Sequence, residues 1–296
     1  MAILAMKTSM ITNKALDGRV IAERNELSVL ELVRNYGHVR RSEIARAIWP
    51  ESSELSAKLM TQRTITRILK KGLLLERPNA LGGKSLVLGA RGVAKLKEMG
   101  IDAQDGLDLS SVAGPQFFHR TLGTRYLIER AAQGHSAYGE YALSKGWAPV
   151  ARTEFIERFG KIPDGIVTVP AQTRGYDTNA VVTDWLEVES SFKSPEELDR
   201  IFGIAWQTGA WLNSAESVML DRVLFVYDSR QRHEHAIINA LARYLKEHHT
   251  PNEQIILSSI ILVRCEISIP LVWRRHEEFT ALELLNKTNE SEELQQ

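Results

Sequence analysis

Two acidic residues alternate with apolar residues in the segment Trp185-Leu186-Glu187-Val188-Glu189. Because successive side chains of a β-strand point to opposite faces, this alternation predicts a strand with both carboxylates on one face and both aliphatic side chains on the other. A second alternating segment, residues 162–167, precedes it in the chain and contains Asp164 after a proline. If the two strands are neighbours, three carboxylates meet at one edge of a sheet.

Carboxylates gathered in this way repel one another, and one or two divalent cations with hard oxygen ligands would relieve that repulsion. We therefore interpret Asp164, Glu187 and Glu189 as candidate ligands of Mg²⁺ or Mn²⁺ in a site for phosphate-ester cleavage. Glu189 acts in this interpretation either as a ligand or as the base that orients the attacking water, and Lys193 supports the charge of the scissile phosphate. The competing interpretation makes the glutamates the polar face of an exposed strand and Lys193 a residue that merely follows it.

The chain has 296 residues, which favours two domains, each large enough for its own core. Its formal net charge of zero conceals an asymmetry, because residues 1–115 carry 18 Lys and Arg residues against 12 Asp and Glu residues. Within residues 38–97 the corresponding counts are 13 and 4. Such a basic segment attracts a polyanion, so the first part of the chain is a candidate nucleic-acid binder.

Helical spacing of apolar residues predicts helices over residues 26–36, from Ser42 to Trp49, and from Ser53 or Ser56 onward, the last with Leu55 and Leu59 in its buried stripe. A strand, a glycine-containing turn and a second strand follow over residues 73–88, and a closing helix follows over residues 90–99. This order resembles the winged helix-turn-helix, which implies that the third helix enters the DNA major groove.

The winged-helix interpretation covers residues 1–99 and nominates basic side chains on the helices and on the wing as contacts to double-stranded DNA. To these we add two residues near the start of the next helix, which are equally consistent with a helix-end ion pair. The candidates are Arg40, Arg41, Arg63, Arg67, Lys70, Lys71, Lys84, His119 and Arg120. A solvated helix face and a protein-interaction module remain the alternatives.

Residues 100–115 are polar, contain glycine and lack a period, so they are the predicted linker. Residues 116–285 are predicted to form an α/β (α+β) domain, and residues 286–296 a disordered acidic tail. The predicted order in that domain is a helix over 116–133, strands over 137–143, 161–169 and 180–190, a helix over 194–212, a strand over 222–227, a helix over 234–248 and one or two strands over 254–269.

This order, with Pro163-Asp164 on one strand and Glu187-Val188-Glu189 on the next, resembles the restriction-endonuclease-like core of the PD-(D/E)XK phosphodiesterases. The resemblance implies a mixed sheet whose acidic residues bind the metal ion. Glu189 stands where that family usually has a lysine, and Lys193 is the candidate to take over its role. Together with the winged helix and His119-Arg120, the chain also resembles the replication-relaxation group, which includes MobC-type relaxases.

These observations predict a metal-dependent DNA-nicking endonuclease of the relaxase type that acts on plasmid or conjugative-element DNA. A tyrosine nucleophile in place of water stays open, with Tyr176 on a long loop as one candidate. The alternatives are a DNA-binding regulator or relaxosome accessory factor with an inactive nuclease-like domain, and an adaptor without DNA affinity.

The expected partners are DNA, other relaxosome or mobilisation proteins and a second copy of the chain as a homodimer. A membrane is not an expected partner, because no run of eighteen or more apolar residues is present. The one cysteine, Cys265, lies in an apolar run, so a disulfide framework is excluded and a cytoplasmic location is expected.

Overall fold

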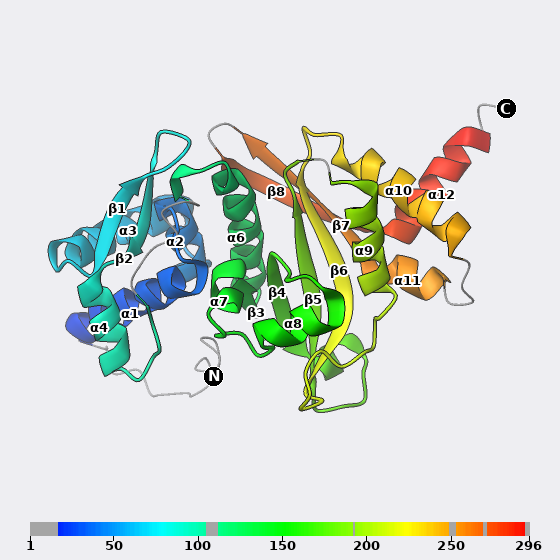
Figure 1. Cartoon of the computed structure of the whole chain (residues 1–296). Helices are drawn as coiled ribbons and strands as arrows, with labels where there is room; N and C mark the ends of the chain where they lie inside the picture. The colour runs from blue at the N-terminus through cyan, green and yellow to red at the C-terminus, as the bar shows by residue number, and fades with distance from the viewer. Residues whose placement is uncertain (1–16, 105–111, 192, 249–252, 269–270, 294–296) are drawn as a thin grey trace. The chain divides into compact units, whose positions relative to one another are not determined.

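The computed structural model describes residues 17–104, 112–191, 193–248, 253–268 and 271–293, with side chains of the last segment described up to residue 287. The architecture is mixed α/β (Figure 1), and the chain divides into two compact units, Met1–Ala148 and Pro149–Gln296. Residues 116–148 therefore group with the first unit, whereas the sequence predicts that they open the second domain. Residues 105–111 of the predicted linker lie outside the described part of the chain.

The first unit contains helices and short strands. Its elements are α1 (Gly18–Tyr36), α2 (Arg41–Ile48), α3 (Glu54–Lys70), β1 (Leu74–Pro78), β2 (Lys84–Leu88), α4 (Ala90–Glu98), α6 (Gln116–Ala132), β3 (Ser136–Gly139) and α7 (Glu140–Ser144). β1 and β2 form an antiparallel hairpin, and Val39, just before α2, makes an antiparallel bridge to Leu86 of β2. Two backbone hydrogen bonds between Val39 and Leu86, of 3.1 and 2.8 Å, fix that bridge.

Helix α3 buries a stripe that includes Ala57, Ile65 and Ile68. The predicted stripe was wrong at two positions, because Leu55 and Leu59 are 67% and 49% exposed. The buried positions recur at the spacing of one helix face, and the two leucines lie outside that face.

The start of α2 also differs from the predicted start at Ser42. The helix begins one residue earlier, at Arg41. The Glu43 carboxylate accepts a hydrogen bond of 2.6 Å from the backbone N–H of Arg40, which satisfies a donor that the helix itself leaves unpaired. Ser42 is exposed and makes no cap.

The second unit is built on a mixed sheet. Its elements are α8 (Arg152–Phe159), β4 (Gly165–Pro170), the short 3₁₀ helix η1 (Ala171–Arg174), β5 (Val181–Glu189), α9 (Pro195–Ala205), β6 (Val218–Asp228), α10 (His233–Glu247), α11 (Glu253–Ser259), β7 (Ile260–Ser268), β8 (Val272–Thr280) and α12 (Ala281–Glu293). Within this unit the strands are ordered β4-β5-β6-β7-β8. β5, β6 and β7 run parallel, whereas β4 and β8 pair antiparallel with their neighbours.

Helices α9, α10 and α11 lie beside β6 and β7 (Figure 1). Ser194 caps α9 by accepting a hydrogen bond from the backbone of Glu197, and a proline occupies the first helical position. The helix therefore starts where one is predicted over residues 194–212, but it ends earlier, at Ala205. Phe202 of α9 packs against Phe225 of β6, with ring centroids 6.0 Å apart. Helix α9 thus packs on β6.

Four elements of the second unit, α8, β8, α11 and α12, differ from expectation. Residues 253–259 form α11 where a strand is predicted, α8 and β8 are not predicted, and α12 covers residues 286–293, where a disordered tail is predicted. Residues 294–296 lie outside the described part. None of the helices in the described ranges combines the length and apolar character needed to cross a bilayer.

Candidate functional site

The three predicted acidic residues lie on neighbouring strands of the second unit. Asp164 immediately precedes β4, and its backbone N–H donates to Leu186 O at 2.9 Å. Its side chain accepts from the backbone N–H of Val188 at 2.7 Å, so Asp164 is anchored across the strand pair. Because β4 and β5 are antiparallel, the start of β4 meets the carboxyl end of β5, where Glu187 and Glu189 are located.

Both glutamates are buried, with Glu187 fully inaccessible and Glu189 2% exposed. Lys193 binds both of them, with its Nζ 2.8 Å from Glu189 Oε1 and 3.7 Å from Glu187 Oε2. A second lysine, Lys161, places its Nζ 3.0 Å from Glu187 Oε2. The predicted site is therefore a buried cluster of carboxylates and ammonium groups.

The proximity of these groups shifts the pKa of Glu187. Burial, with the negative charge of Asp164 next in importance, raises the pKa of Glu187 to about 7, against the opposing effects of the two lysines. A hydrogen bond of 2.7 Å from Trp185 Nε1 to Glu187 Oε1 also favours the ionised form. Burial acts to lower the pKa of Lys193, but the neighbouring glutamates outweigh it and the pKa is raised.

Carboxylate oxygens are suitable ligands for a divalent cation. In this structure, however, lysine ammonium groups contact Glu187 and Glu189. Among the described residues, no group of three or more His, Cys, Asp or Glu side chains is arranged to hold a metal ion. Glu187 Oε2 is fully buried and accepts no hydrogen bond within the described structure, although two ammonium groups lie near it. Such an oxygen is a fitting ligand for Mg²⁺ or Mn²⁺ once the ammonium groups withdraw.

His233 is a further residue near this cluster that the sequence suggests only as a polar helix start. It is buried at the first position of α10, and its Nε2 lies 2.6 Å from Gln231 Oε1. Burial lowers the pKa of His233, and the charge of Lys193 lowers it further. The useful signal in the sequence is its place just after a buried strand, because residues that follow parallel strands meet at one sheet edge.

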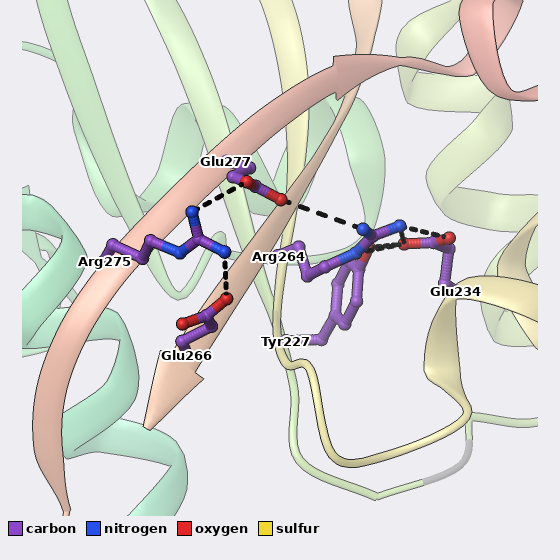
Figure 2. Close-up of polar contacts among 6 residues, drawn as sticks. All are labelled: Tyr227, Glu234, Arg264, Glu266, Arg275 and Glu277. Carbon is purple, nitrogen blue, oxygen red and sulfur yellow. Dashed lines mark hydrogen bonds and ion pairs between the residues drawn. The ribbon is translucent and has the colours of Figure 1, made fainter. Parts of the chain in front are cut away.

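A row of polar residues continues from Glu189 across the sheet. The strand register pairs Glu189 with Tyr227, Tyr227 with Arg264 and Arg264 with Glu277. Figure 2 shows how Tyr227 and Arg264 connect to α10: the Tyr227 hydroxyl donates to Glu234, and Arg264 binds the same carboxylate at 2.7 Å.

The row reaches the edge strand β8. Arg264 contacts Glu277 at 3.8 Å, and Arg275 contacts Glu277 at 3.4 Å and Glu266 at 2.6 Å (Figure 2). The Tyr227 pKa is raised by burial and by its bond to Glu234, which keeps the phenol protonated. These contacts stiffen the sheet beside the carboxylate cluster.

Tyr176, considered above as a nucleophile on a long loop, is held in place. Its hydroxyl donates to Asp221 at 2.8 Å, and its ring packs against the apolar cluster that contains Val169 and Met219. Burial, followed by the bond to Asp221, raises the pKa of Tyr176 to about 12. Arg174 secures the same loop through Asp184 at 3.0 Å and Asp221 at 3.3 Å.

The predicted DNA contacts in the first unit are mostly engaged in ion pairs of that unit. Glu26 pairs with two of them, Glu76 with two more, and Glu43 and Glu140 with one each. The pairs are Arg67 and Lys71 with Glu26, Arg41 and Lys84 with Glu76, Arg40 with Glu43, and Arg120 with Glu140. Arg63 and Lys70 are exposed on α3, and His119 is half-buried on α6.

Comparison of the chain with protein-family models, with curated proteins and with solved structures finds no match. A mixed α/β architecture alone does not identify a function, because such folds support many chemistries. The residues of the site are therefore the basis of a functional proposal.

Proposed function

We propose that the protein is a DNA-binding phosphodiesterase that uses Mg²⁺ or Mn²⁺. The observation that carries this proposal is the buried cluster of Asp164, Glu187 and Glu189 with Lys193 at the carboxyl end of β5. Burying carboxylates together is costly, and such clusters with strongly shifted pKa values occur preferentially at functional sites.

In this proposal Asp164 and Glu187 hold the cation, and Glu189 either joins them or orients the attacking water. The bound cation would lower the pKa of a water molecule and stabilise charge on the phosphate. Lys193 offers a positive charge to the scissile phosphate once its glutamate partners bind the cation. The hydrogen bonds from Trp185 and Val188 keep Glu187 and Asp164 in position throughout.

The finer fold assignment belongs to the same proposal. The order α1, the bridge at Val39, α2, α3 and the β1–β2 hairpin agrees with a winged helix-turn-helix, with Arg63 and Lys70 of α3 facing solvent. The Asp164 strand beside the Glu187 strand agrees with a restriction-endonuclease-like core. By its resemblance to the replication-relaxation group, the proposed substrate is plasmid or conjugative-element DNA.

The test is incubation of supercoiled plasmid DNA with the full chain in Mg²⁺, in Mn²⁺ or in EDTA. We expect nicked circles with either cation, none in EDTA, and none with Glu187→Gln. Because the DNA site is unknown, a pool of plasmids that carry different transfer origins is the substrate. Absence of nicking by the parent protein in every pool would remove the enzymatic proposal.

A regulator with an inactive nuclease-like unit is the second candidate, and one observation favours it. Lys161 and Lys193 already neutralise much of the charge on Glu187 and Glu189 without any cation. Under this alternative the protein shifts a specific DNA fragment equally well in EDTA, and Asp164→Asn leaves that binding unchanged. A cation-dependent cut product would exclude it.

A further inference from the structure

Lys161 lies in the short connection between α8 and β4, two residues before Pro163. Its Nζ is 3.0 Å from Glu187 Oε2, and its side chain is 26% exposed, whereas Glu187 is fully buried. Among the described residues, Glu187 is the one ion-pair partner of Lys161. The ammonium group thus reaches from the surface to a buried carboxylate.

The two lysines of the cluster are held very differently. Lys193 is 13% exposed and contacts Glu187, Glu189 and the carbonyl oxygen of Val188. Lys161 makes its single ion pair from a connection that follows Gly160, a residue in the left-handed conformation that ends α8. Lys161 can therefore turn toward water at the loss of one contact, whereas Lys193 would lose three.

The ammonium group of Lys161 and a divalent cation would compete for the same oxygen. Of the two ammonium groups that contact Glu187 Oε2, that of Lys161 is the nearer, at 3.0 Å against 3.7 Å for Lys193. Lys193 already places a second ammonium group 3.7 Å from this oxygen, so a divalent cation there would meet the repulsion of both lysines. Occupation of the oxygen by the lysine therefore lowers the apparent affinity for a cation.

We propose that Lys161 is a built-in counter-ion of the carboxylate cluster, which occupies Glu187 when no divalent cation is bound and turns outward when one binds. This inference rests on the proposed function, because it requires a cation at the cluster. Lys161 would then affect the affinity for the cation without being a ligand, and the sequence pattern does not identify it. In the free protein the lysine keeps the buried glutamate compensated, which limits the cost of an empty site.

The size of the effect follows from competition. If Lys161 occupies its partner oxygen about nine-tenths of the time, its removal increases the apparent cation affinity about tenfold. Substitution of a lysine far from the cluster removes the same charge, but that charge acts on the cluster only at long range and is screened by salt. Lys246, exposed in the last turn of α10, offers that matched control.

The experiment measures Mn²⁺ binding to the full chain by the electron paramagnetic resonance signal of free Mn²⁺. The proteins are the parent, Lys161→Met, Lys161→Gln, Lys161→Arg and Lys246→Met, each checked by thermal unfolding without metal. We expect about tenfold tighter binding for Lys161→Met and Lys161→Gln, and unchanged binding for Lys246→Met. Lys161→Arg keeps the competing charge and should bind Mn²⁺ no more tightly than the parent.

The outcomes separate this inference from the proposed function. The parent binds Mn²⁺ if the metal site is correct. If both neutral Lys161 variants then bind Mn²⁺ as tightly as the parent or more weakly, the counter-ion role is overturned and the metal site stands. Equal tightening in Lys161→Met and Lys246→Met also overturns it, because net charge would then explain the gain. Absence of Mn²⁺ binding in every folded variant overturns the metal site and the counter-ion role together.

Discussion

Glu187→Gln is the substitution that most sharply probes the electrostatics of the site. Glutamine has the shape of glutamate and keeps an oxygen for the bond from Trp185, but it carries no charge. In the folded protein, burial and Asp164 raise the pKa of Glu187 to about 7, from 4.5 for an ordinary glutamate. The substitution removes this titration.

The magnitude follows from the linkage between proton binding and stability. Each pKa unit corresponds to about 1.4 kcal/mol, so the difference between 4.5 and about 7 corresponds to about 3 kcal/mol. Because the folded state binds this proton more tightly than the unfolded state, the contribution of Glu187 is fully present below pH 4.5. It is lost as the pH rises through 7, so this carboxyl makes the folded protein less stable at higher pH.

The assay is urea denaturation between pH 5 and pH 8, followed by tryptophan fluorescence. Four of the 6 tryptophans, at positions 185, 206, 211 and 273, belong to the second unit and report its unfolding. The free energy of unfolding of the parent should fall relative to that of Glu187→Gln by about 2–3 kcal/mol over this range. Glu157→Gln, at an exposed position of α8, should show no such trend.

A difference between parent and Glu187→Gln that stays constant with pH, to within about 0.5 kcal/mol, would refute the reasoning. It would mean that the two lysines and the Trp185 bond hold Glu187 ionised at all these pH values. The opposite trend, in which the parent gains stability relative to Glu187→Gln as the pH rises, would refute it equally.

Other substitutions test separate parts of the structure. In Gly92→Ala the new Cβ would lie 2.1 Å from Leu73 O, a backbone atom that cannot swing away, so urea denaturation should show a loss of about 2–3 kcal/mol in the first unit. Unchanged stability would contradict the close approach of α4 to the backbone of Leu73. Asp184→Ala leaves the largely buried Arg174 with one carboxylate fewer, so the free energy of unfolding of the second unit should fall by about 3 kcal/mol. A loss below about 1 kcal/mol would show that the loop that carries Arg174 does not depend on this ion pair. Arg63→Ala should reduce the slope of log affinity for DNA against log salt by about one, measured by fluorescence anisotropy, and an unchanged slope would remove this residue from the DNA contacts.

Local patterns in the sequence predict the elements that depend on local physics. Alternation identifies β5 and the shared face of Glu187 and Glu189, and the Ser194-Pro195 signature identifies the start of α9. Both signals arise from neighbours along the chain, so tertiary contacts do not have to be known. The meeting of Asp164 with β5 required only that two successive strands pair.

Features that depend on tertiary contacts could not be predicted from local sequence patterns. Residues 253–259 are few and their apolar residues, 255–257, are consecutive, so their helix could not be told from a buried strand by period alone. The exposure of Leu55 and Leu59 depends on which face of α3 meets α1. The contact of Lys161 with Glu187 depends on α8, a helix that the sequence pattern did not predict.

The central claim is that the carboxylates of Asp164, Glu187 and Glu189 hold a divalent cation. The most direct measurement is a crystal of the full chain grown with Mn²⁺ and examined for anomalous scattering. The claim predicts a peak within coordination distance of Asp164 and Glu187 oxygens, with Lys161 turned away from Glu187. A crystal with Mn²⁺ at other positions only, and with both lysines still bound to the glutamates, would contradict it.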